Sequence, residues 1–313
     1  MNNRIYVVIL MSFLLLSACR HKQTRTIKSD SEAEFAKEMV EFVPYEHNPL
    51  FNGTDSDTWD SHIRERGFIL FEEGIYKMWY TGYKGGDSDP KSLGYATSGD
   101  GISWTRYAQN PIFSQKWTED MFVMKYEGIY YMYAEGNNDI AHLLTSADGI
   151  SWEEQGDLVI LTVRGDTIQG PYGTPSVLVE DGKWYLFYEQ NDEAIWLATS
   201  NNLKTWTNVQ DEPILNTGPE RYDSGAVASN QVIIYKGKYY MYYHGSHDAG
   251  WAIPGATSLW TSNVAMSTDL VHWVKYPKNP VVEGDHSSPI IVPVGNKYRL
   301  YTMHNEVWLY FPR

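Results

Sequence analysis

Five stretches of the chain share one pattern of apolar and polar positions. In each, a turn leads into a run of about seven residues in which aromatic and aliphatic side chains dominate. The first aromatic residues of these runs are Tyr76, Tyr130, Trp184, Tyr239 and Tyr298. The spacings between them are 54, 54, 55 and 59 residues. Such a run is typical of a buried β-strand, and its regular recurrence predicts one structural unit repeated five times.

A second motif follows each of the first four runs. It has a serine and, six residues later, a tryptophan; the pairs are Ser98 and Trp104, Ser146 and Trp152, Ser200 and Trp206, and Ser267 and Trp273. Two residues after the serine stands Asp100, Asp148, Asn202 or Asp269. A side-chain oxygen at this place accepts backbone N–H bonds in a tight turn, so we expect a structural hairpin.

The third motif predicts how the repeats are closed. Residues 107–113 read YAQNPIF, residues 276–282 read YPKNPVV and residues 211–215 read DEPIL. Each ends a repeat, and we interpret each as an outer strand, where proline is tolerated. The last repeat has none, but residues 45–51 near the N-terminus read YEHNPLF. We therefore expect the N-terminal segment to supply the outer strand of the last unit.

Four strands in each of five units predict an all-β fold, a five-bladed β-propeller whose last blade is closed by an N-terminal strand. The propeller domain is expected to span residues 40–313, with no linker inside it. A β-sandwich would not explain the regular period or the split last repeat.

The first residues of the chain have a different pattern. Arg4 precedes the apolar run from Ile5 to Leu16, which is followed by Ser17, Ala18 and Cys19. This is typical of a secretory signal, and the run is short for a membrane span. The sequence L-S-A-C resembles the lipobox of bacterial lipoproteins. We expect a signal peptide over residues 1–18, lipidation at Cys19 and a tether over residues 19–39, so that the domain is anchored outside the cytoplasm, at the outer membrane on the periplasmic or cell-surface side.

Composition narrows the possible functions. The chain has 25 Lys and Arg against 39 Asp and Glu, a formal net charge of −14, which argues against a nucleic-acid partner. Cys19 is the only cysteine, so a disulfide framework and a CxxC metal site are excluded. Aromatic residues make up 15% of the chain, which suits a surface that stacks on sugars as well as a β-fold.

Candidate site residues follow from the propeller geometry, in which the start of the innermost strand and the end of the next one surround the central funnel. Ten residues before each marker aromatic stand Arg66, Asp120, Thr174, Ser229 and Ser288; five after it stand Thr81, Glu135, Glu189, His244 and Met303. Sixteen before it stand Asp60 and Asp223, in the similar contexts WDS and YDS. Paired carboxylates of this kind serve acid/base hydrolysis of glycosidic bonds, and a ring of acids is also a possible calcium site.

Several other residues are candidates for substrate binding. Trp59, Trp117, Trp251 and Trp260 lie in predicted loops where an indole ring can stack on a sugar. His244, His286 and Arg66 are expected to bind hydroxyl or anionic groups, with Arg66 alternatively pairing with Asp120 of the neighbouring blade.

The repeated strands, the serine–tryptophan turns and the phrase LGYATSGDGISW together resemble the five-bladed propeller glycosidases: glycoside hydrolase family 43 and the related families 32, 62, 117 and 130. The resemblance covers residues 45–313. It implies a base Asp in the first blade, an orienting Asp in the second and an acid Glu in the third. Asp120 matches the second position, whereas Arg66 and Thr174 occupy the other two.

We therefore expect a glycoside hydrolase that acts on poly- or oligosaccharides. Asp60 is the predicted base or nucleophile, Asp120 the orienting acid and Glu189 the proton donor, with Asp223 and Glu135 as further candidates. Two alternatives remain open. One is a non-catalytic carbohydrate-binding lipoprotein, and the other is a glycoside phosphorylase in which Arg64 or Arg66 and His244 hold phosphate.

Overall fold

The computed structural model describes residues 34–86, 88–253 and 256–313. The predicted signal peptide, Cys19 and most of the predicted tether lie outside the described residues. A compact unit extends from Phe35 to Arg313. In the part of the chain that the structure describes, no helix is long and apolar enough to cross a membrane.

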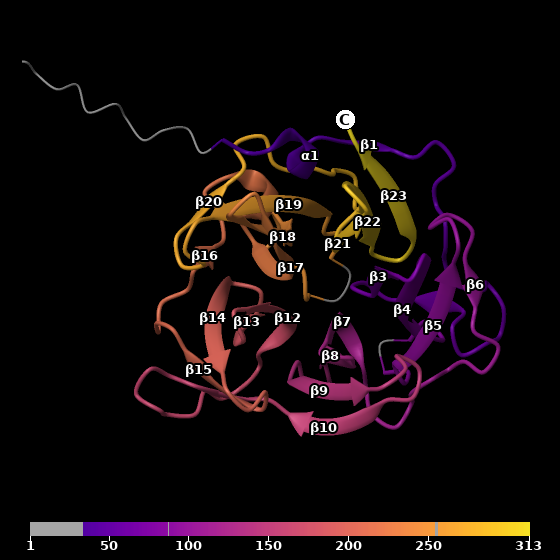
Figure 1. Cartoon of the computed structure of the whole chain (residues 1–313), viewed down its shortest axis with the longest axis horizontal. Helices are drawn as coiled ribbons and strands as arrows, with labels where there is room; N and C mark the ends of the chain where they lie inside the picture. Colours follow the sequence, from indigo (N-terminus) through magenta and orange to yellow (C-terminus); the bar gives the residue numbers. More distant parts are fainter. Residues whose placement is uncertain (1–33, 87, 254–255) are drawn as a thin grey trace, which may run out of the picture. The chain divides into compact units, whose positions relative to one another are not determined.

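Five antiparallel sheets form the blades of a propeller (Figure 1). The first contains β2 (His62–Ile63), β3 (Phe68–Glu72), β4 (Ile75–Tyr83), β5 (Ser92–Ser98) and β6 (Thr105–Arg106). The second contains β7 (Glu119–Tyr126), β8 (Ile129–Glu135), β9 (Ala141–Ser146) and β10 (Glu153–Asp157). The third contains β11 (Val159–Leu161), β12 (Gly173–Glu180), β13 (Lys183–Glu189), β14 (Ala194–Ser200), β15 (Thr205–Asn208) and β16 (Leu215–Asn216), with β11 added in parallel to β15.

The fourth blade contains β17 (Ala226–Tyr235), β18 (Lys238–Ser246), β19 (Trp260–Ser267) and β20 (Trp273–Lys275), preceded by the 3₁₀ turn η1 (Arg221–Asp223). The fifth contains β21 (Pro289–Val294), β22 (Lys297–Met303), β23 (Val307–Pro312) and β1 (Phe42–Pro44). The innermost strands β3, β7, β12, β17 and β21 surround the central axis, and each contacts the next around the full ring (Figure 1). The predicted five-bladed propeller is confirmed.

An N-terminal strand closes the ring as predicted, but it is formed by residues 42–44 and not by residues 45–51, of which Phe51 makes a single bridge to Val307. Phe42, Val43 and Pro44 pair with Pro312, Phe311 and Tyr310 at the outer edge of the last blade. Before this strand, the short helix α1 (Lys37–Val40) packs on the fourth blade, where Tyr242 donates a hydrogen bond to the Met39 carbonyl at 2.8 Å. The segment from Phe35 onward thus joins the fourth and fifth blades.

The serine–tryptophan turns also form as predicted. In the first, the Asp100 carboxylate accepts backbone N–H bonds from Ile102 at 2.8 Å and Ser103 at 2.7 Å. Asp148, Asn202 and Asp269 make the same pair of bonds in their blades. The hydrogen bonds from Ser103 and Ile102 lower the pKa of Asp100 to about 2, so the turn holds its charge under most conditions.

The Asn-Pro motifs, in contrast, are not outer strands. The outermost strands β6 and β20 end before them, and each motif forms a turn that returns to the sheet. The Asn110 side-chain amide takes the place of a strand partner: it accepts from the Tyr95 N–H and donates to the Tyr95 carbonyl, both at 2.9 Å. Asn279 pairs in the same way with Val264, and Asn48 with Leu309.

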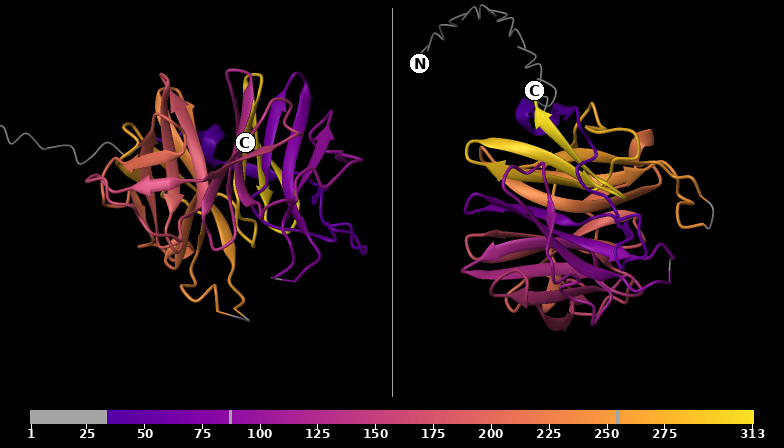
Figure 2. Two further views of the ribbon diagram at one scale, coloured as in Figure 1. Left: turned by 90° about the horizontal axis from the view of Figure 1, so that it is seen from below. Right: turned by 90° about the vertical axis from the view of Figure 1, so that its right-hand side faces the viewer.

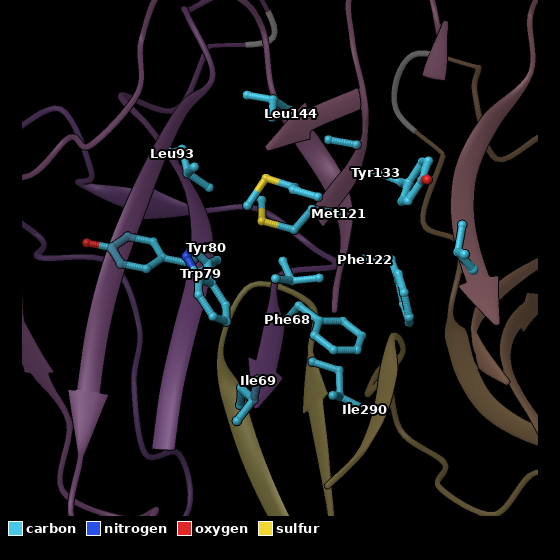
Figure 3. Packing of buried hydrophobic residues seen from close by; sticks show 14 of the residues in the cluster. Phe68, Ile69, Trp79, Tyr80, Leu93, Met121, Phe122, Tyr133, Leu144 and Ile290 are labelled. Atoms are coloured by element: carbon cyan, nitrogen blue, oxygen red, sulfur yellow. The ribbon is translucent and has the colours of Figure 1, made fainter. Parts of the chain in front are cut away.

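The core lies between neighbouring blades. Figure 3 shows Phe68 of the first blade against Phe122 of the second, with ring centroids 4.8 Å apart, and Ile290 of the fifth blade beside them. Trp79 is fully buried and donates a hydrogen bond to the Gly149 carbonyl in the serine–tryptophan turn of the second blade, at 2.7 Å. This packing holds the inner strands at fixed positions around the funnel.

Candidate active site

The inner strands begin with an irregularity that sets the geometry of the funnel. Four of the five residues ten before the marker aromatic have left-handed backbone conformations, with φ of 55° at Arg66, 49° at Asp120, 50° at Thr174 and 61° at Ser288. The strand register shifts at this place in the second, third and fourth blades. Bulges of this kind redirect side chains and occur beside active sites.

A cavity of about 500 Å³ opens at this end of the propeller. Ala249, Trp251 and Ala252 of the β18–β19 connection line it, and the described residues of this connection extend beyond the strands of the fourth blade (Figure 2). Acidic side chains dominate the lining, and among the described lining residues Arg64 is the single one with a permanent positive charge. The acidic lining residues are Glu65, Asp120, Glu135, Asp139, Glu189, Asp192 and Glu193.

Two of these carboxylates are held by consecutive backbone amides. The Gly173 N–H donates to Glu189 Oε1 and the Thr174 N–H donates to Glu135 Oε2, both at 2.9 Å. A second backbone donor, the Asp192 N–H, reaches the other Glu189 oxygen at 2.6 Å. A Cβ on Gly173 would lie 2.0 Å from Glu135 Oε2 and 2.7 Å from Glu189 Oε1. The sequence therefore needs glycine here, because the two carboxylates occupy the space of a side chain.

Beneath the cavity lies Arg66, which is 1% exposed. Its guanidinium donates to the Ser229 carbonyl of the fourth blade at 3.0 Å. Its backbone N–H bonds the Met303 carbonyl of the fifth blade, and its carbonyl accepts from Met121 of the second. Arg66 is therefore a buried residue whose hydrogen bonds join the first blade to the second, fourth and fifth, and it does not line the cavity.

The cavity acids resist ionisation. Burial raises the pKa of Asp120 well above its usual range, and the charges of Glu65 and Glu119 raise it further, against the opposing charge of Arg66. Burial also raises the pKa of Glu135, helped by the charges of Asp120 and Glu189. Carboxylates crowded in this way resist being ionised together, which favours the protonated form of Asp120 and Glu135.

The pKa of Glu65 is shifted in the opposite direction. Burial alone would raise its pKa, but the hydrogen bond with His304 and the charges of His304 and Arg64 lower the pKa well below its ordinary value. The Glu65 side chain is 29% exposed, and its Oε2 lies 3.1 Å from His304 Nδ1. The cavity thus contains a carboxylate whose pKa is lowered beside others, Asp120 and Glu135, whose pKa values are raised, a combination that suits acid/base catalysis.

An aromatic wall faces these acids. Trp251 and Trp260 lie edge to face, with ring centroids 5.4 Å apart, and His244 meets Trp260 at 5.2 Å. All three line the cavity. Burial lowers the pKa of His244 to about 3, and the charge of Arg66 adds to this, so the imidazole is neutral. A wall of indole rings beside carboxylates suits a sugar, which presents an apolar face and hydroxyl edges.

The structure brings together Asp120, Glu135, Glu189, His244 and Trp251, as expected. Trp117 is not a lining residue of the cavity. Its indole N–H donates to Glu119 Oε1 at 2.6 Å and fixes the carboxylate that pairs with Arg64.

Asp60 and Asp223 are not among the residues that line the cavity. Asp60 accepts from the Tyr80 hydroxyl and from Arg106 Nε, both at 2.9 Å. Asp223 accepts from the Tyr243 hydroxyl at 2.9 Å and from Lys275 at 2.5 Å. Each joins the start of its blade to the second strand and to a cation on the outermost strand.

Two further candidates also lie against protein side chains. Trp59 stacks on Tyr80, with ring centroids 5.9 Å apart, and His286 packs on Trp308 at 4.0 Å. Neither is a lining residue of the cavity. For the possible calcium, the described residues contain no group of three or more His, Cys, Asp or Glu side chains placed to hold a metal ion.

The sequence reading missed Glu65, His304 and Asp192. Glu65 and His304 each stand one residue outside the rows that the repeat defines, next to Arg66 and Met303. Arg66, beside Glu65, has a left-handed backbone conformation just before β3, and His304 follows the last residue of β22, so neither Glu65 nor His304 belongs to the regular alternation of a strand.

Comparisons with known proteins agree with the propeller fold. No family model matches the chain. A 1,2-β-oligomannan phosphorylase from a Thermoanaerobacter species is 26% identical over 233 residues, which cover 67% of this chain and 73% of the phosphorylase.

Among solved structures, a glycosyl hydrolase from Bacteroides ovatus matches with a TM-score of 0.69 and 18% identity, over 88% of this chain and 94% of the hydrolase. A β-1,2-mannobiose phosphorylase from Listeria innocua matches with a TM-score of 0.67 and 16% identity, over 87% of this chain and 96% of that enzyme. The chain has the fold of these propeller enzymes. Since the matches include both hydrolases and phosphorylases, the assignment to family 43 stays a prediction.

Proposed function

We propose that the protein is a glycoside hydrolase that acts on neutral oligosaccharides, with β-1,2-linked mannosides as the first substrates to test. The observation that carries this proposal is the cavity itself, in which a tryptophan wall faces a cluster of carboxylates at the funnel of a glycosidase-like propeller. The similarity to enzymes named for β-1,2-mannosides directs the choice of sugar.

In this proposal Asp120 is the general acid and Glu65 the general base. Asp120 holds its proton through burial, and its Oδ1 has no hydrogen-bond partner among the described residues. It donates that proton to the glycosidic oxygen as the bond to the anomeric carbon breaks. Glu65 removes a proton from a water molecule whose oxygen attacks the anomeric carbon. The net change is the addition of one water across the bond.

The other carboxylates suit substrate binding. Glu189 has both oxygens fixed by backbone N–H groups and Glu135 has one, so their remaining lone pairs are directed and rigid. Acceptors of this kind bind sugar hydroxyls without a cost for ordering the side chains.

The charge of the cavity favours hydrolysis over phosphorolysis. A phosphate ion would enter a site with seven acidic side chains. Arg64 is already paired with Glu119 and lies 3.9 Å from Glu65, while His244 is uncharged. Phosphate binding requires cations that are free to form charge-assisted hydrogen bonds. The name of the oligomannan phosphorylase relative nevertheless makes phosphorolysis the second activity to assay.

The test is the incubation of the protein with β-1,2-mannobiose and a panel of aryl glycosides, with and without phosphate. We expect phosphate-independent release of mannose. Glu65→Gln and Asp120→Asn are expected to lower kcat/KM by about 10²-fold or more, since general acid–base catalysis contributes on this scale. Glu153→Gln, a change at an exposed position on β10, is the matched control.

Two results would redirect the proposal. Release of mannose 1-phosphate that depends on phosphate would establish a phosphorylase. Binding of the sugar without turnover by the wild-type protein would establish a carbohydrate-binding protein. The acid role of Asp120 has its own signature: Asp120→Asn should retain activity on aryl glycosides whose leaving group needs no proton.

The location of the protein is a separate proposal. We propose that Cys19 is lipidated and anchors the enzyme outside the cytoplasm, on the basis of the L-S-A-C sequence. Incorporation of labelled palmitate by the full chain, lost in Cys19→Ala, is the expected result. Equal labelling of both chains would contradict it.

A further inference from the structure

A histidine outside the cavity lining connects the proposed base to the aromatic wall. His304 follows β22, and its Nδ1 lies 3.1 Å from Glu65 Oε2. Its Nε2 lies 3.8 Å from Asp285 Oδ2. The ring therefore stands between a carboxylate of the first blade and one of the fifth.

Asp285 is itself fixed. Its Oδ1 accepts a hydrogen bond from the backbone N–H of Trp260 at 3.0 Å, so one oxygen faces the aromatic wall and the other faces His304. The hydroxyl of Ser287 lies 3.0 Å from His304 Nδ1 on the same side as Glu65. Contacts at both ring nitrogens thus determine the position of the ring.

The charges around His304 favour its protonated form. Two anions, Glu65 and Asp285, face it, and the cation Arg64 lies on the far side of Glu65. His244, His286 and Glu306 are further titratable groups near His304 or Glu65, and Glu119, Asp120 and Asp192 interact with Glu65 from the second and third blades. Burial opposes a charge on His304, but the hydrogen bond with Glu65 and the charges of Glu65 and Asp285 raise its pKa above the ordinary value.

We propose that His304 is a positioning residue, which stays protonated during turnover, holds the Glu65 carboxylate ionised and directs it into the cavity, while Asp285 fixes the ring. This inference rests on the proposed hydrolase function. It assigns His304 no contact with substrate. Its effect passes through Glu65, in the way that the buried partner of a catalytic group sets the charge and orientation of that group.

The pH dependence gives this inference a definite sign. Glu65 acts as a base only when ionised, and protonated His304 lowers the pKa of Glu65. A neutral side chain at position 304 therefore raises that pKa, and the fall of activity on the acid side moves to higher pH. A purely structural role would lower activity at every pH by the same factor.

The experiment compares kcat/KM against pH for the wild-type protein and His304→Asn, whose amide retains a donor near the position of Nδ1. We expect the acid limb of the His304→Asn profile to move to higher pH by about one unit or more. At pH values below this limb, kcat/KM of His304→Asn should then be about tenfold lower than that of the wild type. KM is expected to stay within about twofold, because uniform binding is unaffected.

The matched control is His272→Asn. His272 forms the same kind of pair, with Nδ1 2.7 Å from Asp269 Oδ2, but on an exposed turn of the fourth blade. Its profile should coincide with that of the wild type. An unmoved acid limb in a folded, active His304→Asn protein would overturn the inference.

A second measurement does not depend on activity. Nitrogen-15 NMR of the imidazoles in the full chain, with the His304 signal identified by its absence in His304→Asn, reports the charge directly. We expect His304 to remain protonated above its ordinary pKa of about 6.5 and to lose that shift in Glu65→Gln. A neutral His304 at pH 6 would overturn the inference even if no substrate is hydrolysed. Failure of hydrolysis with a charged His304 would overturn only the proposed function. If His304→Asn does not fold, His304→Gln provides the pH profile and identifies the NMR signal.

Discussion

At the scale of single residues, the site depends on where backbone groups leave room for carboxylates. Gly173 is the sharpest case, since its N–H binds Glu189, the next N–H binds Glu135, and its missing side chain is the space in which both carboxylates sit. The repeat located Glu135 and Glu189, because both end a strand at the same place in the pattern. It could not locate Glu65 or His304, because Glu65 precedes the left-handed backbone at Arg66 and His304 lies beyond the end of β22, so both lie outside the alternation from which facing is inferred.

Gly173→Ala tests this arrangement. The added methyl displaces both carboxylates, and misplacement of groups at a site by about 1 Å costs about 10²-fold in rate, so we expect kcat/KM to fall on that scale. Gly99→Ala is the control, since a Cβ at Gly99 meets nothing within 4 Å. Equal kcat/KM for both variants in an assay of initial rates would show that the two carboxylates play no part.

Asp60 belongs to a real sequence pattern, but its role in the structure is to hold the blade together and not to line the cavity. The shared WDS and YDS contexts do mark equivalent positions, but Asp60 and Asp223 each bond a buried tyrosine and a cation on the outermost strand. Those cations, Arg106 in β6 and Lys275 in β20, stand 46 and 52 residues further along the chain. Both strands are short and carry no motif, so the sequence did not indicate these pairs.

Asp60→Asn is therefore expected to lower stability and to leave kcat/KM within about twofold. The substitution weakens one ion pair with a partly exposed arginine, which costs about 1–3 kcal/mol in the free energy of unfolding. Urea unfolding and initial rates on the same preparation separate the two effects. A large loss of rate without a loss of stability would restore Asp60 to the catalytic role that the sequence suggested.

At the scale of elements, the repeats predicted the five blades and the serine–tryptophan turns, because both follow from local patterns, whereas the additional strands of the first and third blades were not predicted. The Asn-Pro segments were misread as strands. Proline does indicate the edge of a sheet, yet here an asparagine side chain replaces the strand that would continue that edge. An asparagine amide places an N–H donor and a carbonyl acceptor side by side, as a backbone peptide group does, so the side chain satisfies the exposed edge.

Asn110→Ala removes both bonds to Tyr95, and we expect a loss of about 1–3 kcal/mol in the free energy of unfolding. Asn279→Ala should cost a similar amount in the fourth blade, and the double variant should show the sum, because the two sites share no partners. Denaturant midpoints measured for the three proteins check this. A double variant no less stable than either single one would mean that the two blades are coupled.

At the scale of the whole molecule, closure of the ring was predictable because the fifth repeat lacks what the N-terminal segment supplies. The contacts of α1 on the fourth blade were not, since residues 35–40 have no counterpart in any repeat. Met39, Val40 and Phe42 are nearly or fully buried in this closure.

Deletion of residues 1–44 is expected to destabilise the propeller severely. The buried side chains of Met39, Val40 and Phe42 alone contribute about 5 kcal/mol or more, a large share of the total stability of a typical domain. The comparison is a chain that lacks only residues 1–33, and the measurement is thermal unfolding followed by circular dichroism. Equal melting temperatures for the two chains would show that the closing strand is dispensable.

The pairing of β1 with β23 also has a consequence for biosynthesis. Asn48 forms hydrogen bonds with Leu309, a residue 261 positions later. The ring therefore cannot close until nearly the whole domain has emerged from the ribosome. Until then β1 has no partner, and the inner strands β3 and β17 of the first and fourth blades lack their neighbour β21. Contacts between such distant positions slow folding, and unpaired strand edges invite association with other chains. A nascent chain of this protein is therefore expected to depend on chaperones until its last blade is made.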